Sequence, residues 1–146
     1  MLRFALALFL LLETAYADSC PDGYALWQNG KCYRVVSERN VHLHEAVDLC
    51  NAEGANLPSM HSADEVKNLF NAAKNIGGLD AYWIGLKLIW TDGSNVDYKP
   101  SDFPAQCDWY NHPLYYQGDD STWTPATINN VLPVICQKNV DRSGEN

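Results

Sequence analysis

Carboxylates able to bind a metal ion or a polar ligand gather in the second half of the chain. They lie in turn-like segments without helical or strand periodicity, at Asp97, Asp102, Asp108, Asp119 and Asp120. Ca²⁺ prefers oxygen ligands of this kind and takes about six to eight of them. Solvated turn residues are the favoured interpretation, because aspartate side chains also stabilise turns. A rearranged Ca²⁺ site is the alternative.

Aromatic residues are interleaved with these carboxylates, at Trp109, Tyr110, Tyr115, Tyr116 and Trp123. Strand alternation would turn about half of these rings outward, where they stack on a sugar face or anchor a protein partner. Ordinary aromatic residues of a sheet are the favoured interpretation. The ligand-binding candidates of the chain are Asp102, Asp108, Trp109, Tyr115, Asp119, Asp120 and Trp123.

Motifs for catalysis are missing from the sequence. It has no Gly-x-Ser-x-Gly elbow and no His-Glu-x-x-His motif, and its four histidines form no recognisable triad with the serines. We therefore expect neither an enzyme nor a catalytic residue. A hydrolase is the rival from another class, and it would need a cleft with a nucleophile and a base within hydrogen-bond reach.

The first 17 of the 146 residues have the pattern of a secretory signal peptide. A basic start at Met1-Leu2-Arg3 precedes an apolar run from Phe4 to Leu12, and Ala15-Tyr16-Ala17 resembles a cleavage site. The apolar run is too short to span a membrane. We expect a secreted protein with one domain over residues 18–138 and a polar tail over residues 139–146.

The net charge of −8 limits the classes of partner. An acidic surface argues against binding to nucleic acid or to an anionic membrane. The expected partner is an extracellular glycan or a protein.

Five cysteines in a secreted domain imply a disulfide framework with one thiol left over. A local hairpin closed by Cys20 and Cys32 is the simplest interpretation. Joining Cys50 to Cys136 would close a long loop and contribute roughly 4 to 5 kcal/mol in the chain-entropy model. Cys107 would then be unpaired, although the sequence alone does not fix the pairing. A buried thiol is favoured for Cys107, and a covalent dimer through it is the alternative.

Two helices are predicted from local patterns. Apolar residues at Leu43, Ala46, Val47 and Cys50 have helical spacing, with Asn40 or His42 as a cap and Gly54 beyond the end. Ser62 and Glu65 form a capping box ahead of a second apolar repeat, which Gly77-Gly78 ends.

Strands are predicted on both sides of these helices. Cys32–Val36 precedes them, and Trp83–Leu86, Leu88–Trp90, Leu114–Tyr116 and Leu132–Cys136 follow, with a tight turn at Asp92-Gly93-Ser94. Gly85 is expected where a side chain would obstruct close approach of the backbone. Segregated elements of this kind indicate an α+β domain with antiparallel sheets.

Several of these residues, taken together and in order, resemble the C-type lectin-like domain family. The matching segments are Cys50, Gly54–Leu57, Ser62–Glu65, Trp83–Leu86, Trp90–Ser94 and Ile135-Cys136. The resemblance extends from Cys20 to Gln137, and the pair Cys20 and Cys32 is similar to the long form of the domain. It implies two helices with antiparallel sheets and a loop-rich binding end.

The family's Ca²⁺-dependent sugar site is not matched. The resemblance implies an Asn-Asp pair after the tryptophan at Trp123, but Thr124 and Pro125 stand there. Neither Pro100 nor Pro104 has carbonyl-bearing side chains on both sides, as the family's loop motif requires. We therefore expect a recognition module that binds a glycan or a protein without a Ca²⁺ cofactor. A Ca²⁺-dependent lectin with a divergent site is the alternative.

Overall fold

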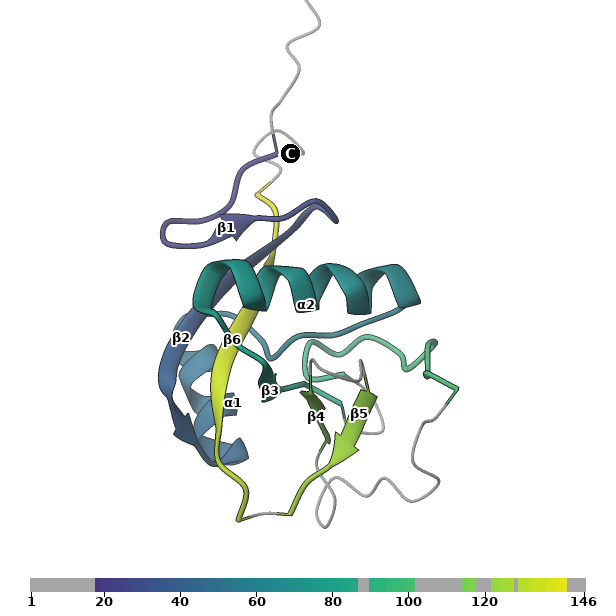
Figure 1. Ribbon diagram of the computed structural model, residues 1–146. Coiled ribbons are helices and arrows are strands. Elements are labelled where there is room, and N and C mark those ends of the chain that lie inside the picture. The colour runs from purple at the N-terminus through teal and green to yellow at the C-terminus, as the bar shows by residue number, and fades with distance from the viewer. Residues whose placement is uncertain (1–17, 87–89, 102–113, 118–121, 128, 142–146) are drawn as a thin grey trace, which may run out of the picture.

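The computed structural model describes residues 18–86, 90–101, 114–117, 122–127 and 129–141 (Figure 1). Within these ranges the elements in chain order are β1 (Ala25–Leu26), β2 (Lys31–Val41), α1 (Leu43–Ala52), α2 (Ala63–Gly77), β3 (Ala81–Trp83), β4 (Leu114–Gln117), β5 (Thr122–Pro125) and β6 (Leu132–Asn139). The strands form two antiparallel sheets with the orders β1-β2-β6 and β3-β4-β5. The predicted α+β class is confirmed.

The paired strands β2 and β6 form a middle layer with apolar residues on both faces. Tyr33 and Ile135 contribute to one buried cluster, whereas Cys32 and Cys136 contribute to a second. Successive side chains of a strand point to opposite faces, so neighbours in sequence enter different clusters. This layer therefore divides the core in two.

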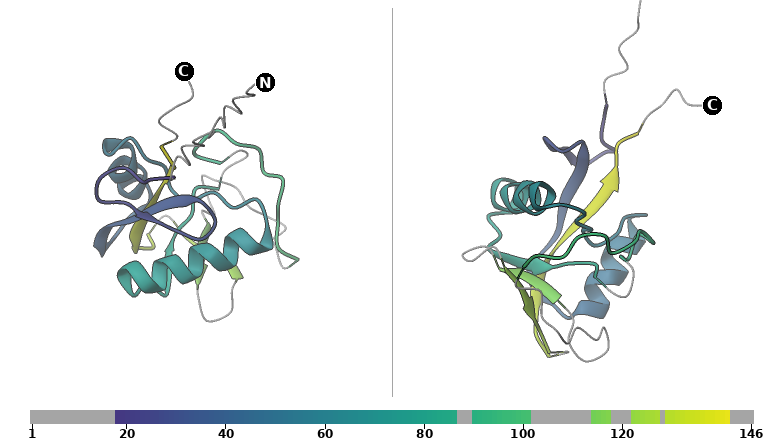
Figure 2. Two further views of the ribbon diagram at one scale, coloured as in Figure 1. Left: turned by 90° about the horizontal axis from the view of Figure 1, so that it is seen from above. Right: turned by 90° about the vertical axis from the view of Figure 1, so that its right-hand side faces the viewer.

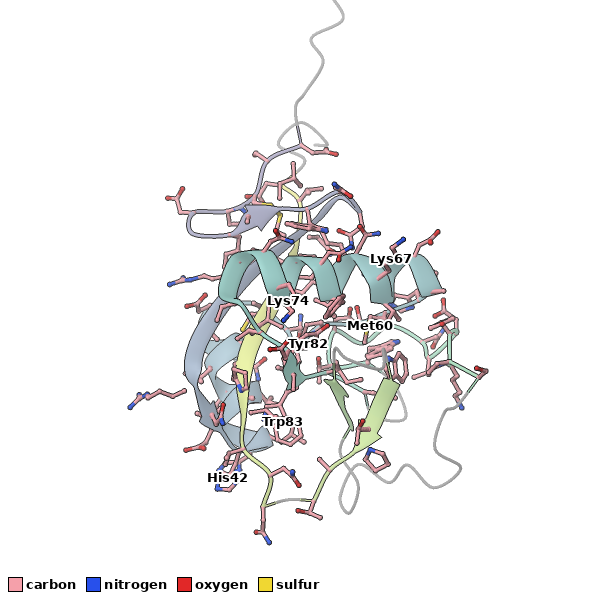
Figure 3. The ribbon with its side chains drawn as sticks, in the orientation of Figure 1. His42, Met60, Lys67, Lys74, Tyr82 and Trp83 are labelled. Atoms are coloured by element: carbon pink, nitrogen blue, oxygen red, sulfur yellow. A yellow bond between two sulfur atoms is a disulfide. The ribbon has the colours of Figure 1, made fainter. Side chains whose placement is uncertain are left out.

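One helix covers each face of the middle layer (Figure 2). Buried residues of α2 join the cluster of Tyr33, and buried residues of α1 join the cluster of Cys32. The short strand β3 continues the division, with Tyr82 on the α2 side and Trp83 on the opposite side (Figure 3). No helix among the described residues is long and apolar enough to cross a membrane.

Both disulfides expected from the sequence are present. Cys20–Cys32 ties the N-terminal segment to β2, and Cys50–Cys136 ties α1 to β6 within the buried core. The second bond joins residues 86 positions apart. It therefore fixes a contact whose formation would otherwise carry a large loop-closure entropy.

Both predicted helices are confirmed, and their caps show how the chain enters them. His42 precedes α1, and the Glu45 carboxylate accepts a hydrogen bond from the His42 backbone N–H (2.9 Å). The Ser62 hydroxyl caps α2 by accepting from the Glu65 N–H (3.2 Å). The Glu65 carboxylate accepts from the N–H of His61 (2.9 Å) rather than from that of Ser62. The predicted capping box thus closes one residue early.

The strands differ from the predictions in extent. β2 continues through a polar segment to Val41 because β6 remains as its partner, with Ser37 paired to Val134 and Val41 paired to Leu132. Register shifts on both sides of Ser37 accommodate the residues in between. The strand predicted at Trp83–Leu86 is wrong in position, since β3 is Ala81–Trp83 and forms the outer strand in the order β3-β4-β5. Beyond it the structure has an isolated bridge between Leu86 and Trp90, and residues 87–89 lie outside the described ranges.

Gly85 lies where two backbone segments come together, as predicted. Its N–H donates to the Pro58 carbonyl (3.0 Å), and its carbonyl accepts from the Thr91 N–H (2.8 Å). A Cβ atom at this position would clash with Thr91 Oγ1 and lie 3.0 Å from the Leu57 carbonyl oxygen. The absent side chain therefore permits the hairpin after β3 to pack on the segment before α2.

Gly85→Ala should lower the free energy of unfolding by about 1 to 3 kcal/mol, because overpacking forces backbone and side chains to shift. In a Thr91→Ala background the same substitution should cost about 1 kcal/mol less, since Oγ1 is gone. Chemical denaturation of the four proteins of this cycle measures both effects. Equal costs in the two backgrounds would contradict the contact.

Candidate functional site

The loop end predicted to bind a ligand falls mostly outside the described residues. This holds for Asp102, Cys107, Asp108, Trp109, Asp119 and Asp120. The backbone of Tyr115 is described, in β4, where it pairs with Trp83 on one side and Thr124 on the other. The described residues contain no group of three or more His, Cys, Asp or Glu side chains arranged to hold a metal ion.

Trp123 lies in the core, and its inclusion among the surface candidates is corrected. Its side chain is 2% exposed. Its ring packs edge-on against Trp90 (5.7 Å between centroids) and Tyr98 (6.2 Å). Side chains alternate between the two faces of a strand, and Trp123 lies on the face of β5 that points into the core. Its ring therefore packs against other aromatic rings and is not available to a ligand.

The structure instead brings together a polar cluster that the sequence did not reveal. Its members come from the start of β2, the segment before and into α2, the hairpin after β3, and the end of β6. We call it the hairpin network, and it consists of Lys31, Ser59, His61, Glu65, Asp92, Ser94, Asp97 and Gln137. The residues are remote in sequence, so no local motif signals their meeting.

Asp92 is the centre of the network. The Gln137 amide nitrogen donates to Ser59 Oγ (3.2 Å), and the Ser59 hydroxyl donates to Asp92 Oδ2 (2.6 Å). The other carboxylate oxygen accepts from the N–H and the hydroxyl of Ser94 (2.9 and 2.5 Å). Three donors thus hold one carboxylate at the tip of the hairpin, and one of them ties it to the segment before α2.

A second chain of contacts runs from Ser94 to Asp97 through a histidine. His61 Nε2 lies 3.1 Å from Ser94 Oγ, and His61 Nδ1 lies 2.6 Å from Asp97 Oδ1. The Ser94 hydroxyl gives its proton to Asp92, so it can only accept from His61. The His61 ring therefore links Ser94 to Asp97 through its two nitrogens.

Ser94, His61 and Asp97 have the order of a nucleophile, a base and an orienting acid, which a hydrolase requires. Their hydrogen bonds oppose that use. A nucleophilic serine must deliver its proton to the base, whereas the Ser94 hydroxyl delivers it to Asp92. The Ser94 N–H, which could otherwise stabilise an oxyanion, is bound to the same carboxylate. The arrangement fixes the hairpin and lacks the free groups that acyl transfer needs.

A third part of the network joins β2 to α2. Lys31 Nζ forms an ion pair with Glu65 Oε2 (2.9 Å) and donates to the Ser59 carbonyl (3.3 Å). Both charged side chains are largely covered, so this pair is less screened than a surface pair. It holds the entry of α2 against the start of the middle layer.

The two aspartates of the network have lowered pKa values. Partial burial acts to raise the pKa of Asp92, but hydrogen bonds from Ser59 and Ser94 and the nearby His61 outweigh that effect. The hydrogen bond from His61 holds the pKa of Asp97 below its usual value. Burial raises the pKa of Tyr33, which lies in the adjoining core.

The free energy of unfolding should fall as the pH drops below about 4, the usual aspartate pKa. A carboxyl whose pKa is lowered in the folded state stabilises that state at pH values above the unfolded pKa. This stabilisation is lost as the pH falls and the carboxyl becomes protonated in the folded state. Asp92→Asn should flatten this dependence, and Ser59→Ala, which removes one donor, should flatten it less. Denaturation curves between about pH 3 and pH 6 measure the slopes. A slope unchanged by Asp92→Asn would contradict the assignment.

The described fold defines a class: a small disulfide-linked α+β domain whose two helices cover opposite faces of a middle layer. Comparison with known proteins gives the family. The chain matches the Lectin C-type domain over residues 39–138, and it belongs to this family. The predicted resemblance is thereby confirmed.

Known relatives and solved structures match this chain over most of its length. Snaclec 4 of Daboia siamensis is 30% identical over 142 residues, covering 90% of this chain and 92% of the relative. The crystal structure of CEL-IV is 28% identical and covers 87% of this chain and 99% of the other, with a TM-score of 0.68. A calcium-independent type II antifreeze protein is 22% identical with coverages of 87% and 99% and a TM-score of 0.70, a likeness of fold.

Proposed function

We propose that this protein is a secreted recognition module that binds an extracellular glycan or protein through its loop end without Ca²⁺. In this proposal residues 1–17 are removed, residues 18–138 form the domain and residues 139–146 are a tail. The loop end comprises the candidates Asp102, Asp108, Trp109, Tyr115, Asp119 and Asp120, of which Tyr115 belongs to β4 and the others precede or follow that strand in sequence. Membership of the Lectin C-type domain family supports recognition as the general role.

One observation supports independence from Ca²⁺. The ring of Trp123 is buried in the core beneath β5, and the two residues that follow it in this strand are Thr124 and Pro125. Threonine offers one neutral hydroxyl and proline offers no side-chain oxygen, whereas Ca²⁺ needs several charged or carbonyl oxygens. Pro125 is exposed on the strand, so the residue that offers no side-chain oxygen lies at the surface.

The same set of glycans should bind in Ca²⁺ and in EDTA when the mature protein is applied to a glycan array. If the array is negative, the ligand is a protein, and capture from extracellular fluid should be equally indifferent to EDTA. Isothermal titration with Ca²⁺ should show no binding in the micromolar range. Binding that disappears in EDTA, or micromolar Ca²⁺ affinity, would establish the divergent Ca²⁺-dependent lectin instead.

A matched pair of variants locates the ligand. Trp109→Ala at the loop end should weaken ligand binding at least tenfold, as loss of an aromatic anchor does, and leave the fold intact. Leu26→Ala removes an exposed apolar side chain from β1 and should change neither binding nor the fold. Equal ligand affinity in wild type and the Trp109 variant would remove this residue from the site.

Cys107 is proposed to remain a thiol. Four of the five cysteines are used by Cys20–Cys32 and Cys50–Cys136, so no partner cysteine is left within the chain. Secreted protein should migrate as a monomer without reducing agent and show one reactive thiol after denaturation. A dimer band that Cys107→Ser abolishes would demonstrate the intermolecular disulfide.

A further inference from the structure

Three turns of the chain place an aspartate or an asparagine directly before a glycine, at Asp22-Gly23, Asn29-Gly30 and Asp92-Gly93. The peptide nitrogen of such a glycine can attack the carbonyl carbon of the preceding side chain and close a five-membered ring. The two atoms belong to one covalent segment, and glycine has no side chain to obstruct their approach. All three glycines have positive φ, of 81°, 72° and 86°. The three sites are therefore alike in sequence and in glycine conformation, and they differ in their hydrogen bonds.

The turn at Asn29-Gly30 holds both reacting groups. The Gly30 N–H donates to the Trp27 carbonyl (2.9 Å). Asn29 Oδ1 accepts from the Lys31 N–H (3.2 Å), and Asn29 Nδ2 donates to the Tyr33 hydroxyl (2.9 Å). Ring closure has to turn the side-chain amide toward the glycine nitrogen and free that nitrogen from its acceptor. These hydrogen bonds therefore slow the reaction.

The turn at Asp92-Gly93 is held in the same way. The Gly93 N–H donates to the Trp90 carbonyl (2.9 Å), and the Asp92 carboxylate accepts from Ser59 and Ser94. Both reacting groups are again occupied, so this site is protected as well.

The turn at Asp22-Gly23 leaves both reacting groups free, because its glycine lies one position earlier in the turn. Its hydrogen bond runs from the Tyr24 N–H to the Pro21 carbonyl (3.0 Å), so Gly23 is the third residue and its own N–H takes no part. Neither the Gly23 N–H nor the Asp22 carboxylate has a hydrogen-bond partner in the described part of the chain. Both residues are also exposed to solvent.

We propose that Asp22-Gly23 is a site of spontaneous isoaspartate formation, and that the other two turns are protected by their hydrogen bonds. The Gly23 nitrogen forms a bond to Cγ of Asp22, and its proton leaves with the carboxyl hydroxyl as water, which gives a succinimide. Water then adds to one of the two ring carbonyls and breaks its bond to nitrogen. Opening at the main-chain carbonyl gives isoaspartate, and opening at the side-chain carbonyl restores aspartate. The water released in the first step is returned in the second, so no other reagent is consumed.

The modification has a structural consequence at Tyr24. Isoaspartate adds one carbon to the main chain and so moves the Tyr24 N–H relative to the Pro21 carbonyl. Tyr24 is 9% exposed, its hydroxyl donates to Glu53 at the end of α1 (2.9 Å), and Lys138 Nζ of β6 lies 4.6 Å from the centre of its ring. The modified turn would therefore loosen the N-terminal segment from α1 and β6. This turn leads into β1, which lies away from β4 and β5 (Figure 1), so modification here and ligand binding at the loop end can fail independently.

The test ages the mature, disulfide-bonded protein at neutral pH and body temperature. Isoaspartyl methyltransferase labelling and peptide mass spectrometry of the aged protein should find isoaspartate at position 22 and not at position 92. Asp22→Glu keeps the charge but would have to close a six-membered ring, so it should abolish the label. An unlabelled aged wild type, a label that Asp22→Glu leaves unchanged, or isoaspartate mainly at position 29 or 92 would overturn the proposal.

A second variant compares two identical dipeptides in one chain. Asp22→Asn places Asn-Gly in the free turn, with the same leaving group, ammonia, as at Asn29. Deamidation at position 22 should be about tenfold faster than at Asn29 or more, because several hydrogen bonds hold one site and none holds the other. In the reduced protein unfolded in guanidinium chloride, the two rates should converge. Equal rates in the folded protein would refute the protection, and a ratio that persists after unfolding would assign it to local sequence instead.

Discussion

The structure depends on one strand pair, β2 and β6, being buried on both faces. A strand that is covered on one side alternates apolar and polar residues, whereas these strands place successive apolar residues in two separate clusters. Each helix needs the pair as the surface on which to bury its own apolar face. The disulfide between Cys50 and Cys136 ties α1 to the pair within one of these clusters. Removal of either strand would expose both halves of the core.

The hairpin network is built on the end of this pair. The start of β2 supplies Lys31, and the end of β6 supplies Gln137. Because Gly85 has no side chain, the hairpin approaches the segment that contains Ser59 closely enough for Ser59 to reach Asp92. A substitution that shifts the backbone of β2 or β6 would therefore displace residues of the network without changing their charges.

Features encoded by neighbouring residues could be predicted, and those encoded by distant residues could not. The helices have a period and caps within a few residues, so their bounds were close to those observed. Trp123 was ambiguous because strand alternation gives two faces but does not say which one is buried. The bonds of Ser59 to Asp92 and Gln137 join residues 33 and 78 positions apart, and only the folded chain shows them. The Ser94 bonds to Asp92 are local, and the predicted turn at Asp92-Gly93-Ser94 was the one signal available.

At the loop end, the proposed independence from Ca²⁺ depends on the residue types at Thr124 and Pro125, because neither side chain offers a charged or carbonyl oxygen. The hairpin network is defined by hydrogen bonds between described residues. Asp97 belongs to this network, and the loop-end candidate Asp102 follows five residues later, so their Cα atoms lie at most about 18 Å apart. The network therefore holds the backbone from which the loop end departs.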